Sequence, residues 1–189
     1  MKIVKVSFLC IALCLVTISC VKDVDFDQAE GIVLTPVIES NLLFFDEPAP
    51  SFVNENGSEV AFVKDSVVVE VFNDEFVRDN LQKAILLFEA TNTINRGYEA
   101  KVDFLNEADE LQYTLLFNIP TAVNNQEVLV EQEEVFEGDN LEAFKTTNKL
   151  ALTLTMFPST DGSSLDEDSL GSLRFRSKGT FFFNIDTSE

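Results

Sequence analysis

The chain has 189 residues, with 33 acidic residues against 13 lysines and arginines and a net charge of −20 at pH 7. A field of that sign repels nucleic acid and anionic headgroups, so we expect no nucleic-acid partner. The chain has no histidine, which removes the usual general base near neutral pH, every Ser-His-Asp or Cys-His arrangement and most zinc sites.

The first residues have the order of a signal peptide. Lys2 and Lys5 precede an apolar stretch over 6–21. That stretch has roughly 16 residues, fewer than the about 20 that a membrane span needs. Cys20 lies at its end, directly after Ser19. The same order of residues also fits two other interpretations: a single-pass membrane anchor, and an ordinary secretory signal that is cut near Ser19.

The segment Val16-Thr17-Ile18-Ser19-Cys20 resembles the lipobox of bacterial lipoproteins, although Thr17 stands where these proteins usually carry leucine. The resemblance implies that residues 1–19 are removed and that Cys20 is lipidated, with acyl chains such as palmitate. The other two cysteines, Cys10 and Cys14, would leave with the signal. The mature chain would then form no internal disulfide and would fold on its core alone.

Residues 20–30 are expected to form an acidic tether. Lys22-Asp23 after the cysteine is similar to the surface-export signal of Bacteroidetes lipoproteins; the alternative is a solvated tether without a signal. Together with the composition rich in Phe, Asn and Asp, this makes the chain resemble small lipoproteins of Flavobacterium-type bacteria. The resemblance implies an outer-membrane location, lipid-anchored, at the cell surface or on the periplasmic face.

Residues 31–189 are expected to form a single domain. Apolar runs at 32–38 and 42–45 predict two short strands or one broken strand. The run at 60–63 predicts a short edge strand, and the β-branched run at 67–72 predicts another strand.

The clearest local pattern is a predicted β-hairpin. Apolar residues alternate with polar ones from Tyr98 to Phe104 and again from Leu111 to Ile119, and residues 106–110 form a polar connection between the two runs. Alternation recurs at 150–156 and at 173–185, where Gly179 marks a bend or bulge within a long strand.

Two short helical turns are predicted to close the ends of the sheets. One begins at Asp139 as N-cap, with Glu142 three residues on, and the other begins near Asp74. About eight strands with no βαβ rhythm, each with one polar face, predict an all-β antiparallel sandwich, immunoglobulin-like in general character.

The acidic loop at 159–169 is a candidate calcium site. Asp161, Asp166 and Asp168 would supply oxygen ligands, although their spacing does not match the EF-hand pattern. The alternative, which we favour, is a solvated connection in a very acidic chain.

A second candidate is a row of cations. Arg174, Arg176 and Lys178 are spaced to lie on one face of one strand, where they would bind an acidic partner or outer-leaflet phosphates. The alternative reading, again favoured, is that they protect the sheet from aggregation or pair with acids on neighbouring strands.

Consecutive apolar residues form a third candidate. Side chains alternate along a strand, so Phe182 should face away from Phe181 and Phe183, and the run at 42–45 poses the same problem. Either other elements cover the outward side chains or a patch is free to bind a partner, and we favour cover, because contiguous exposed patches are rare on monomers.

These patterns predict a non-catalytic binding or structural role in the cell envelope. The expected partners are the membrane, through the lipid, and an envelope protein or extracellular ligand. No cofactor is expected apart from the covalent lipid. The alternatives are a calcium-dependent adhesive module and a hydrolase that uses two carboxylates, a pair that the sequence cannot select among 33 acidic residues.

Overall fold

The computed structural model describes residues 32–69, 72 and 74–186, and residues 34–185 of this part form one compact unit. The described residues contain ten strands: β1 (Val33–Leu34), β2 (Val37–Pro48), β3 (Phe62–Val68), β4 (Leu81–Asn92), β5 (Tyr98–Leu105), β6 (Leu111–Ile119), β7 (Val128–Phe136), β8 (Lys149–Met156), β9 (Ser172–Phe183) and β10 (Ile185–Asp186). Two α-helices, α2 (Glu75–Asn80) and α3 (Asp139–Lys145), and two 3-10 turns, Ala49–Phe52 and Val123–Asn125, complete the elements.

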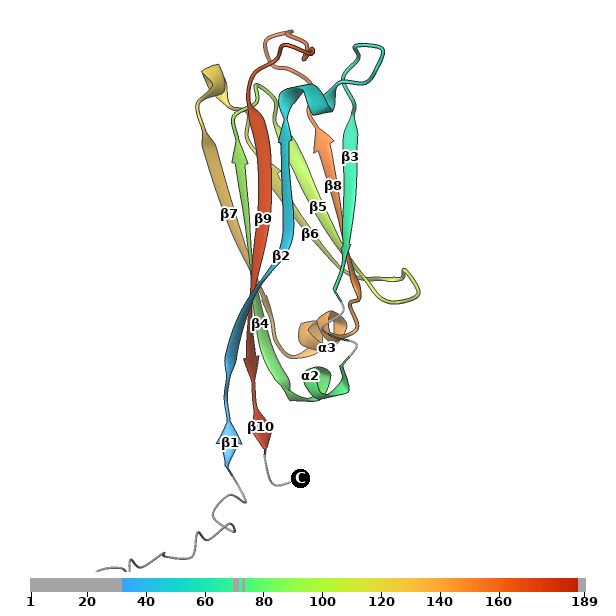
Figure 1. Ribbon diagram of the computed structural model, residues 1–189, viewed down its shortest axis with the longest axis vertical. Coiled ribbons are helices and arrows are strands. Elements are labelled where there is room, and N and C mark those ends of the chain that lie inside the picture. Colours follow the sequence, from blue (N-terminus) through green and yellow to red (C-terminus); the bar gives the residue numbers. More distant parts are fainter. Residues whose placement is uncertain (1–31, 70–71, 73, 187–189) are drawn as a thin grey trace, which may run out of the picture. The chain divides into compact units, whose positions relative to one another are not determined.

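Eight of the strands form two four-stranded sheets that face each other (Figure 1). One sheet has the order β2-β9-β4-β7 and the other has the order β3-β8-β5-β6, and every pairing within them is antiparallel. β1 and β10 pair with each other in a two-stranded sheet. The predicted antiparallel β-sandwich is therefore confirmed.

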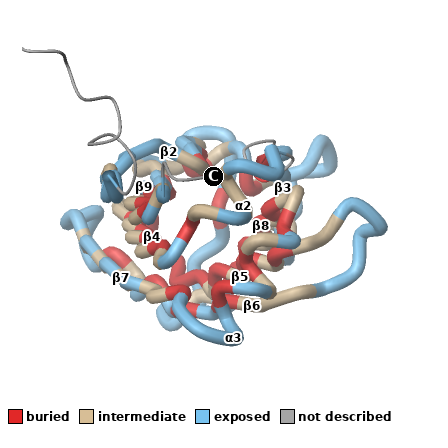
Figure 2. The backbone as a smooth tube through the Cα atoms, turned by 90° about the horizontal axis from the view of Figure 1, so that it is seen from below, coloured by how far each residue is buried: buried red, intermediate tan, exposed pale blue. Residues whose placement is uncertain are grey.

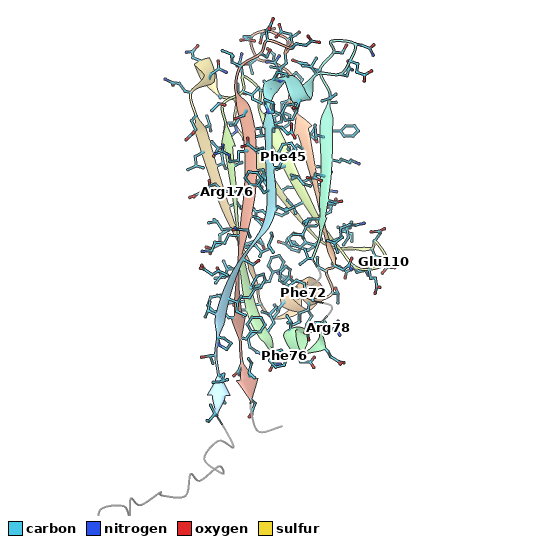
Figure 3. All side chains as sticks on the ribbon, in the orientation of Figure 1. Phe45, Phe72, Phe76, Arg78, Glu110 and Arg176 are labelled. Atoms are coloured by element: carbon cyan, nitrogen blue, oxygen red, sulfur yellow. The ribbon has the colours of Figure 1, made fainter. Side chains whose placement is uncertain are left out.

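The core is built largely from phenylalanine. Buried positions alternate along β5, β8 and β9, and these positions line the space between the two sheets (Figure 2). Eleven phenylalanines are buried. At one end Phe72 (Figure 3), Phe136 and Phe144 lie in one ring cluster, with centroids 4.5 Å apart for Phe136–Phe144 and 4.7 Å apart for Phe72–Phe144. Phenylalanine has no polar atom to satisfy, so it suits a core that excludes water.

The predicted hairpin is confirmed as β5 and β6. Tyr98 pairs with Ile119 and Phe104 pairs with Tyr113. The amide of Asn106 donates to the carbonyl of Glu110 at 3.0 Å and closes the connection, and Asp109 takes a positive φ of 60° within it.

Two long strands, β4 and β7, were not predicted individually, although the two four-stranded sheets together contain the expected number of about eight strands. β4 lies between β9 and β7, and its outer face carries apolar residues such as Ile85 and Leu87, which blur the alternation. β7 is a sheet edge whose inward positions include Gln132 and Glu134, so its middle, residues 131–134, is polar on both faces and shows no alternation. Pairing with neighbouring strands of the sheet therefore stabilises the extended conformation of β4 and β7, which their local sequence periodicity does not indicate.

The predicted boundaries agree with the structure in one region and differ from it in others. Residues 42–45 continue the strand that begins at Val37 and a bulge between Asn41 and Phe44 interrupts its pairing, so β2 agrees with the expectation of one broken strand. The runs predicted at 60–63 and 67–72 overlap a single strand, β3. The predicted bulge at Gly179 is absent from the pairing of β9 with β4 there, because Gly179 pairs directly with Leu86. Gly179 instead leaves room for the ring of Phe181, which a Cβ atom would approach to 2.6 Å.

The two predicted helical turns exist, and they lie at the same end of the sandwich (Figure 1) rather than at both ends. Asp74 caps α2 by accepting a hydrogen bond from the amide of Phe76 at 2.9 Å. Asp139 is the first residue of α3 and not its N-cap; Gly138 takes that place with φ 57° and ψ −133°. Only glycine adopts that backbone conformation readily, which explains why the cap lies one residue earlier than expected.

Candidate binding site on the outer face of the β2-β9-β4-β7 sheet

The three predicted cations lie where the alternation of β9 places them. Arg174, Arg176 and Lys178 are exposed, while Phe175 and Ser177 between them are buried. The structure therefore brings the three cations together on the outer face of the β2-β9-β4-β7 sheet.

Each of these cations is paired with an acid on a neighbouring strand. Arg174 Nε lies 3.1 Å from Asp46 Oδ2, and Lys178 Nζ lies 2.7 Å from Glu39 Oε1, both on β2. Arg176 Nη2 lies 2.5 Å from Glu89 Oε1 on β4, and the hydrogen bond and charge of Glu89 raise the pKa of Arg176. Cross-strand pairing, the alternative favoured from the sequence, is thus present in the geometry.

A β-bulge in β2 shapes the surface beside these cations. Asn41 pairs with Lys178 and Phe44 pairs with Arg176, so β2 has one more residue than β9 between these two pairs. The amide of Leu43 turns to the side chain of Ser177 and donates to its Oγ at 3.0 Å. Bulges redirect side chains and are common beside functional sites.

The redirected side chain is Phe44. Its exposed fraction is 69%, while Leu43 and Phe45 (Figure 3) on either side are buried. Alternation requires part of the run 42–45 to face outward. The favoured expectation that other elements cover this part is wrong for Phe44, whereas Leu42 is partly buried against the core.

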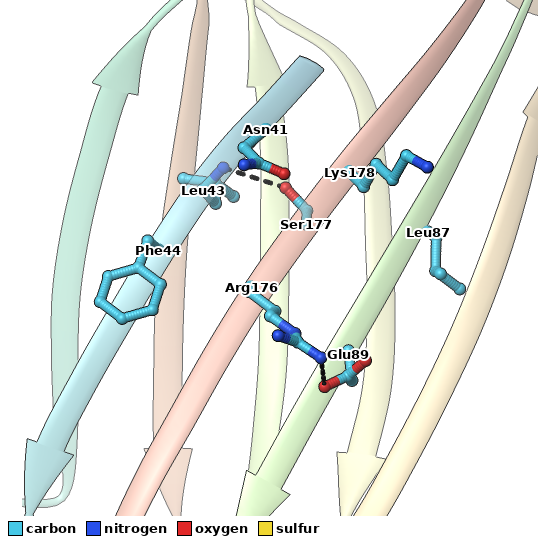
Figure 4. A pocket seen from close by; sticks show the side chains of 8 residues that line it. All are labelled: Asn41, Leu43, Phe44, Leu87, Glu89, Arg176, Ser177 and Lys178. Atoms are coloured by element: carbon cyan, nitrogen blue, oxygen red, sulfur yellow. Dashed lines mark hydrogen bonds and ion pairs between the residues drawn. The ribbon is translucent and has the colours of Figure 1, made fainter. Parts of the chain in front are cut away.

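A pocket of about 580 Å³ opens beside Phe44 on this face (Figure 4). We call it the bulge pocket. It is lined by residues of three strands, namely Asn41, Leu43, Phe44, Leu87, Glu89, Arg176, Ser177 and Lys178. A second hollow of about 230 Å³ adjoins it and shares Asn41 and Lys178 with it. Two of the three predicted binding residues, Arg176 and Lys178, therefore line the bulge pocket, and Arg174 does not.

The predicted calcium ligands are placed differently. The carboxylate of Asp161 accepts hydrogen bonds from Ser159 Oγ at 2.6 Å, Ser163 N at 2.9 Å and Asn95 Nδ2 at 2.9 Å. These donors, the Ser159 hydroxyl foremost, hold the pKa of Asp161 well below its usual range. Asp161 is thereby engaged in closing its own loop.

Asp166 acts similarly, since its Oδ1 accepts from Ser169 Oγ at 2.8 Å and from the amide of Asp168 at 3.1 Å. Within residues 32–69, 72 and 74–186, no group of three or more His, Cys, Asp or Glu side chains is placed to hold a metal ion. The structure therefore does not gather Asp161, Asp166 and Asp168 into a cation site.

The same end of the sandwich contains a buried ion pair that the sequence did not suggest. Arg96, whose side chain is fully buried, contacts Glu59 through Nε at 3.1 Å and Nη2 at 2.5 Å. Glu59 also accepts from the amide of Leu165 at 2.7 Å, and Arg96 donates to the carbonyl of Ser163 at 2.5 Å. This network ties together three loops that are distant in sequence. The only local signal for it was a lone arginine between two strands.

Cys20, the predicted lipidation site, lies outside the described residues. Among the residues that are described, no helix has the length and apolar character that a membrane crossing requires.

Comparison with known proteins gives a fold-level likeness alone. No protein-family model matches the chain, and no curated protein matches it. A protein of Parabacteroides distasonis assigned as secreted is 16% identical with a TM-score of 0.46, over 66% of this chain and 38% of that one. The VP2 subviral particle of infectious bursal disease virus is 10% identical with a TM-score of 0.44, over 78% of this chain and 32% of VP2. The enzymatically active domain of tailspike protein 4 of bacteriophage CBA120 is 10% identical with a TM-score of 0.35, over 80% and 19%.

Proposed function

We propose that this chain is a non-catalytic binding protein of the bacterial cell envelope, anchored through a lipid on Cys20, and that it binds its ligand in the bulge pocket. The observation that carries the binding role is the exposed ring of Phe44 beside a pocket of about 580 Å³.

The exposure of Phe44 costs free energy that a bound ligand would recover. Fully burying a phenylalanine side chain stabilises a protein by roughly 1.5–3 kcal/mol, and Phe44 forgoes most of that in the free chain. The bulge that holds Phe44 outward has its own hydrogen bond, from the Leu43 amide to Ser177. The outward ring is therefore a built feature of the sheet and not a strand end that lacks a partner.

The pocket also has the composition of a binding site. Phe44 and Leu87 give it apolar walls, and Arg176, Lys178 and Asn41 give it a small number of polar groups. Ligand sites in proteins are commonly hollows of about 300–1,000 Å³ with this mixture of apolar walls and a few polar groups. Three strands of a rigid sheet hold these side chains, so the site is formed before any ligand arrives.

The envelope location rests on the sequence around Cys20. The basic lead-in, the apolar stretch and the lipobox-like segment 16–20 support export and lipidation. A mature chain that has lost Cys10 and Cys14 needs no disulfide, because the phenylalanine core is complete without one.

The binding role is tested by a photo-crosslinking amino acid, p-benzoylphenylalanine, placed at position 44 in cells that produce the full chain. The matched control carries the same residue at position 62, because Phe62 has a similar exposed fraction of 58% on the outer face of the other sheet. We expect intact-mass spectrometry to show one discrete adduct, either a small molecule or a protein, on the protein with the crosslinker at position 44 and none on the control. Equal adducts at both positions, or none at position 44, would contradict the proposal.

A further inference from the structure

We infer that the bulge pocket is selective for an apolar carboxylate, that is, a small molecule with a ring-sized or short-chain apolar body and one carboxylate group. This inference rests on the proposed function and names the chemistry of the ligand at the same site.

The unused hydrogen-bonding capacity of the pocket lies mostly on donors, beside which the Oδ1 atom of Asn41 and the Oε2 atom of Glu89 can also accept. The ion pair of Arg176 with Glu89 uses one guanidinium nitrogen, Nη2, although an arginine carries five N–H donors. Lys178 Nζ has three donors and is paired with Glu39 at 2.7 Å. Among the described residues, no hydrogen bond uses the side-chain amide of Asn41. A ligand that satisfies these groups must bring acceptors, and a carboxylate brings two acceptor oxygens.

The one anion among the described residues that line the pocket is already ion-paired. Glu89, whose side chain is 16% exposed, accepts from Arg176 at 2.5 Å. A ligand that carried a cation would have to displace Arg176 from Glu89 and would meet Lys178 beside it. A ligand carboxylate instead accepts hydrogen bonds from the N–H groups of Arg176 that Glu89 does not use. The planar guanidinium can donate to both carboxylate oxygens at once.

The distance between the apolar walls of the pocket limits the size of the apolar part of the ligand. Phe44 stands on β2 and Leu87 stands on β4, and β9 lies between these two strands. Neighbouring strands are about 4.8 Å apart, so the walls are roughly 10 Å apart across the backbone of β9. A phenyl ring or a short alkyl chain fills such a trough, with its carboxylate at Arg176 (Figure 4).

The charge of the whole chain argues against a second copy as the occupant. Two chains with a net charge of −20 repel each other, and β2 carries Glu39, Asp46 and Glu47 at the edge of the sheet. A small monoanion meets much less repulsion, because salt at 0.1 M screens charges beyond about 10 Å. The volume of about 580 Å³ also lies in the range of small-molecule sites.

The inference is tested by titrating the purified chain, residues 20–189 with Cys20→Ala, with 3-phenylpropionate and with its neutral counterpart 3-phenylpropanol. Chemical shifts in NMR spectra report the binding. We expect saturable binding of 3-phenylpropionate, at least tenfold tighter than binding of the alcohol. Arg176→Gln should weaken binding of the carboxylate at least tenfold. Glu89→Gln should tighten it, because it removes the negative charge that competes for the guanidinium.

Two further variants separate binding from folding. The double variant Arg176→Gln/Glu89→Gln leaves no unpaired charge at the pair and should fold, yet bind the carboxylate as weakly as Arg176→Gln alone. Phe44→Ser should weaken both probes, whereas Phe62→Ser on the opposite sheet should change neither.

The outcomes distinguish this inference from the proposed function. If both probes bind equally, or if Arg176→Gln binds the carboxylate as well as the unmodified residue does, the carboxylate selectivity is wrong while the pocket remains a binding site. If neither probe binds and position 44 gives no crosslinked adduct, both are wrong. A dimer in sedimentation that dissociates with Phe44→Ser would show that a second copy occupies the pocket and would overturn the inference.

Discussion

Tyr98 shows how one buried hydroxyl affects the response of the protein to pH. Its side chain is fully buried, and within the described part of the chain its hydroxyl has no hydrogen-bond partner. Burial raises the pKa of Tyr98, because the phenolate would be poorly solvated between the sheets. Tyr113 behaves similarly, since burial and its 2.6 Å hydrogen bond to Glu134 raise its pKa to about 12.

The stability of the folded chain should therefore fall in alkaline solution. An unfolded tyrosine loses its proton near pH 10, whereas the folded chain holds both protons above that pH. The stabilising contribution is complete below pH 10 and is lost as the pH rises toward the folded pKa values, by up to about 1.4 kcal/mol per pH unit for each group.

Tyr98→Phe isolates one of the two groups. We expect it to change the free energy of unfolding little at pH 7, because no described hydrogen bond is lost, and to reduce the decline between pH 10 and 12. Tyr113→Phe should instead lose stability at pH 7, because Glu134 loses its donor. Urea unfolding at pH 7, 10, 11 and 12 measures both effects. An unchanged alkaline decline in Tyr98→Phe would show that Tyr98 titrates normally.

At the scale of residues, the sequence indicates on which face of a strand a side chain lies, but it does not indicate which residues of other strands lie beside it. The spacing of Arg174, Arg176 and Lys178 was sufficient to place them on one face, because alternation is a local property of a strand. Their partners Asp46, Glu89 and Glu39 come from other strands, and only the sheet order determines them. Arg96 and Glu59 pair across 37 residues for the same reason.

The bulge in β2 is the element on which the pocket depends. It shifts the alternation of β2 by one residue, so that Phe44 faces solvent on the same side as Arg176 while Leu43 and Phe45 lie in the core. The hydroxyl of Ser177, itself buried, takes over the hydrogen bond that the extra residue would otherwise leave unmade. The geometry of the pocket thus depends on one serine of the neighbouring strand.

Ser177→Ala should destabilise the sheet at this point. The Leu43 amide would be buried without a partner, at a cost of about 1–3 kcal/mol in the free energy of unfolding. The matched control is Ser66→Ala on β3, where the serine is exposed and a change within about 0.5 kcal/mol is expected. Chemical denaturation of both variants tests this. A loss at position 177 no larger than the loss at position 66 would show that the hydroxyl does not support the bulge.

At the scale of elements, prediction from the sequence succeeded where one face of a strand is solvated and the other is buried. The hairpin of β5 and β6 and the strands β8 and β9 have that character. It failed for β4, which carries apolar residues on both faces, and for β7, whose acids extend to its inward side. The bulge in β2 could not be predicted, because it exists only as a difference in register between two strands.

At the scale of the whole molecule, we propose that the sandwich is attached to a membrane by a lipid tether on Cys20. The sandwich of residues 34–185 carries its binding surface on the outer face of one sheet and has an excess of acidic charge that favours solubility. In the proposed function, the lipid on Cys20 and not the sandwich determines where the protein is held in the cell. A single acyl chain holds a protein only marginally, whereas two or more chains hold it stably.

The central claim is that the chain acts outside the cytoplasm, attached through Cys20. Intact-mass spectrometry of the protein extracted from cell membranes with detergent tests it most directly. The account predicts a mature chain that lacks residues 1–19 and carries a diacylglycerol-sized or larger adduct on Cys20, and a soluble, unmodified product for Cys20→Ala. A full-length, unmodified N-terminus in the membrane fraction would contradict the claim.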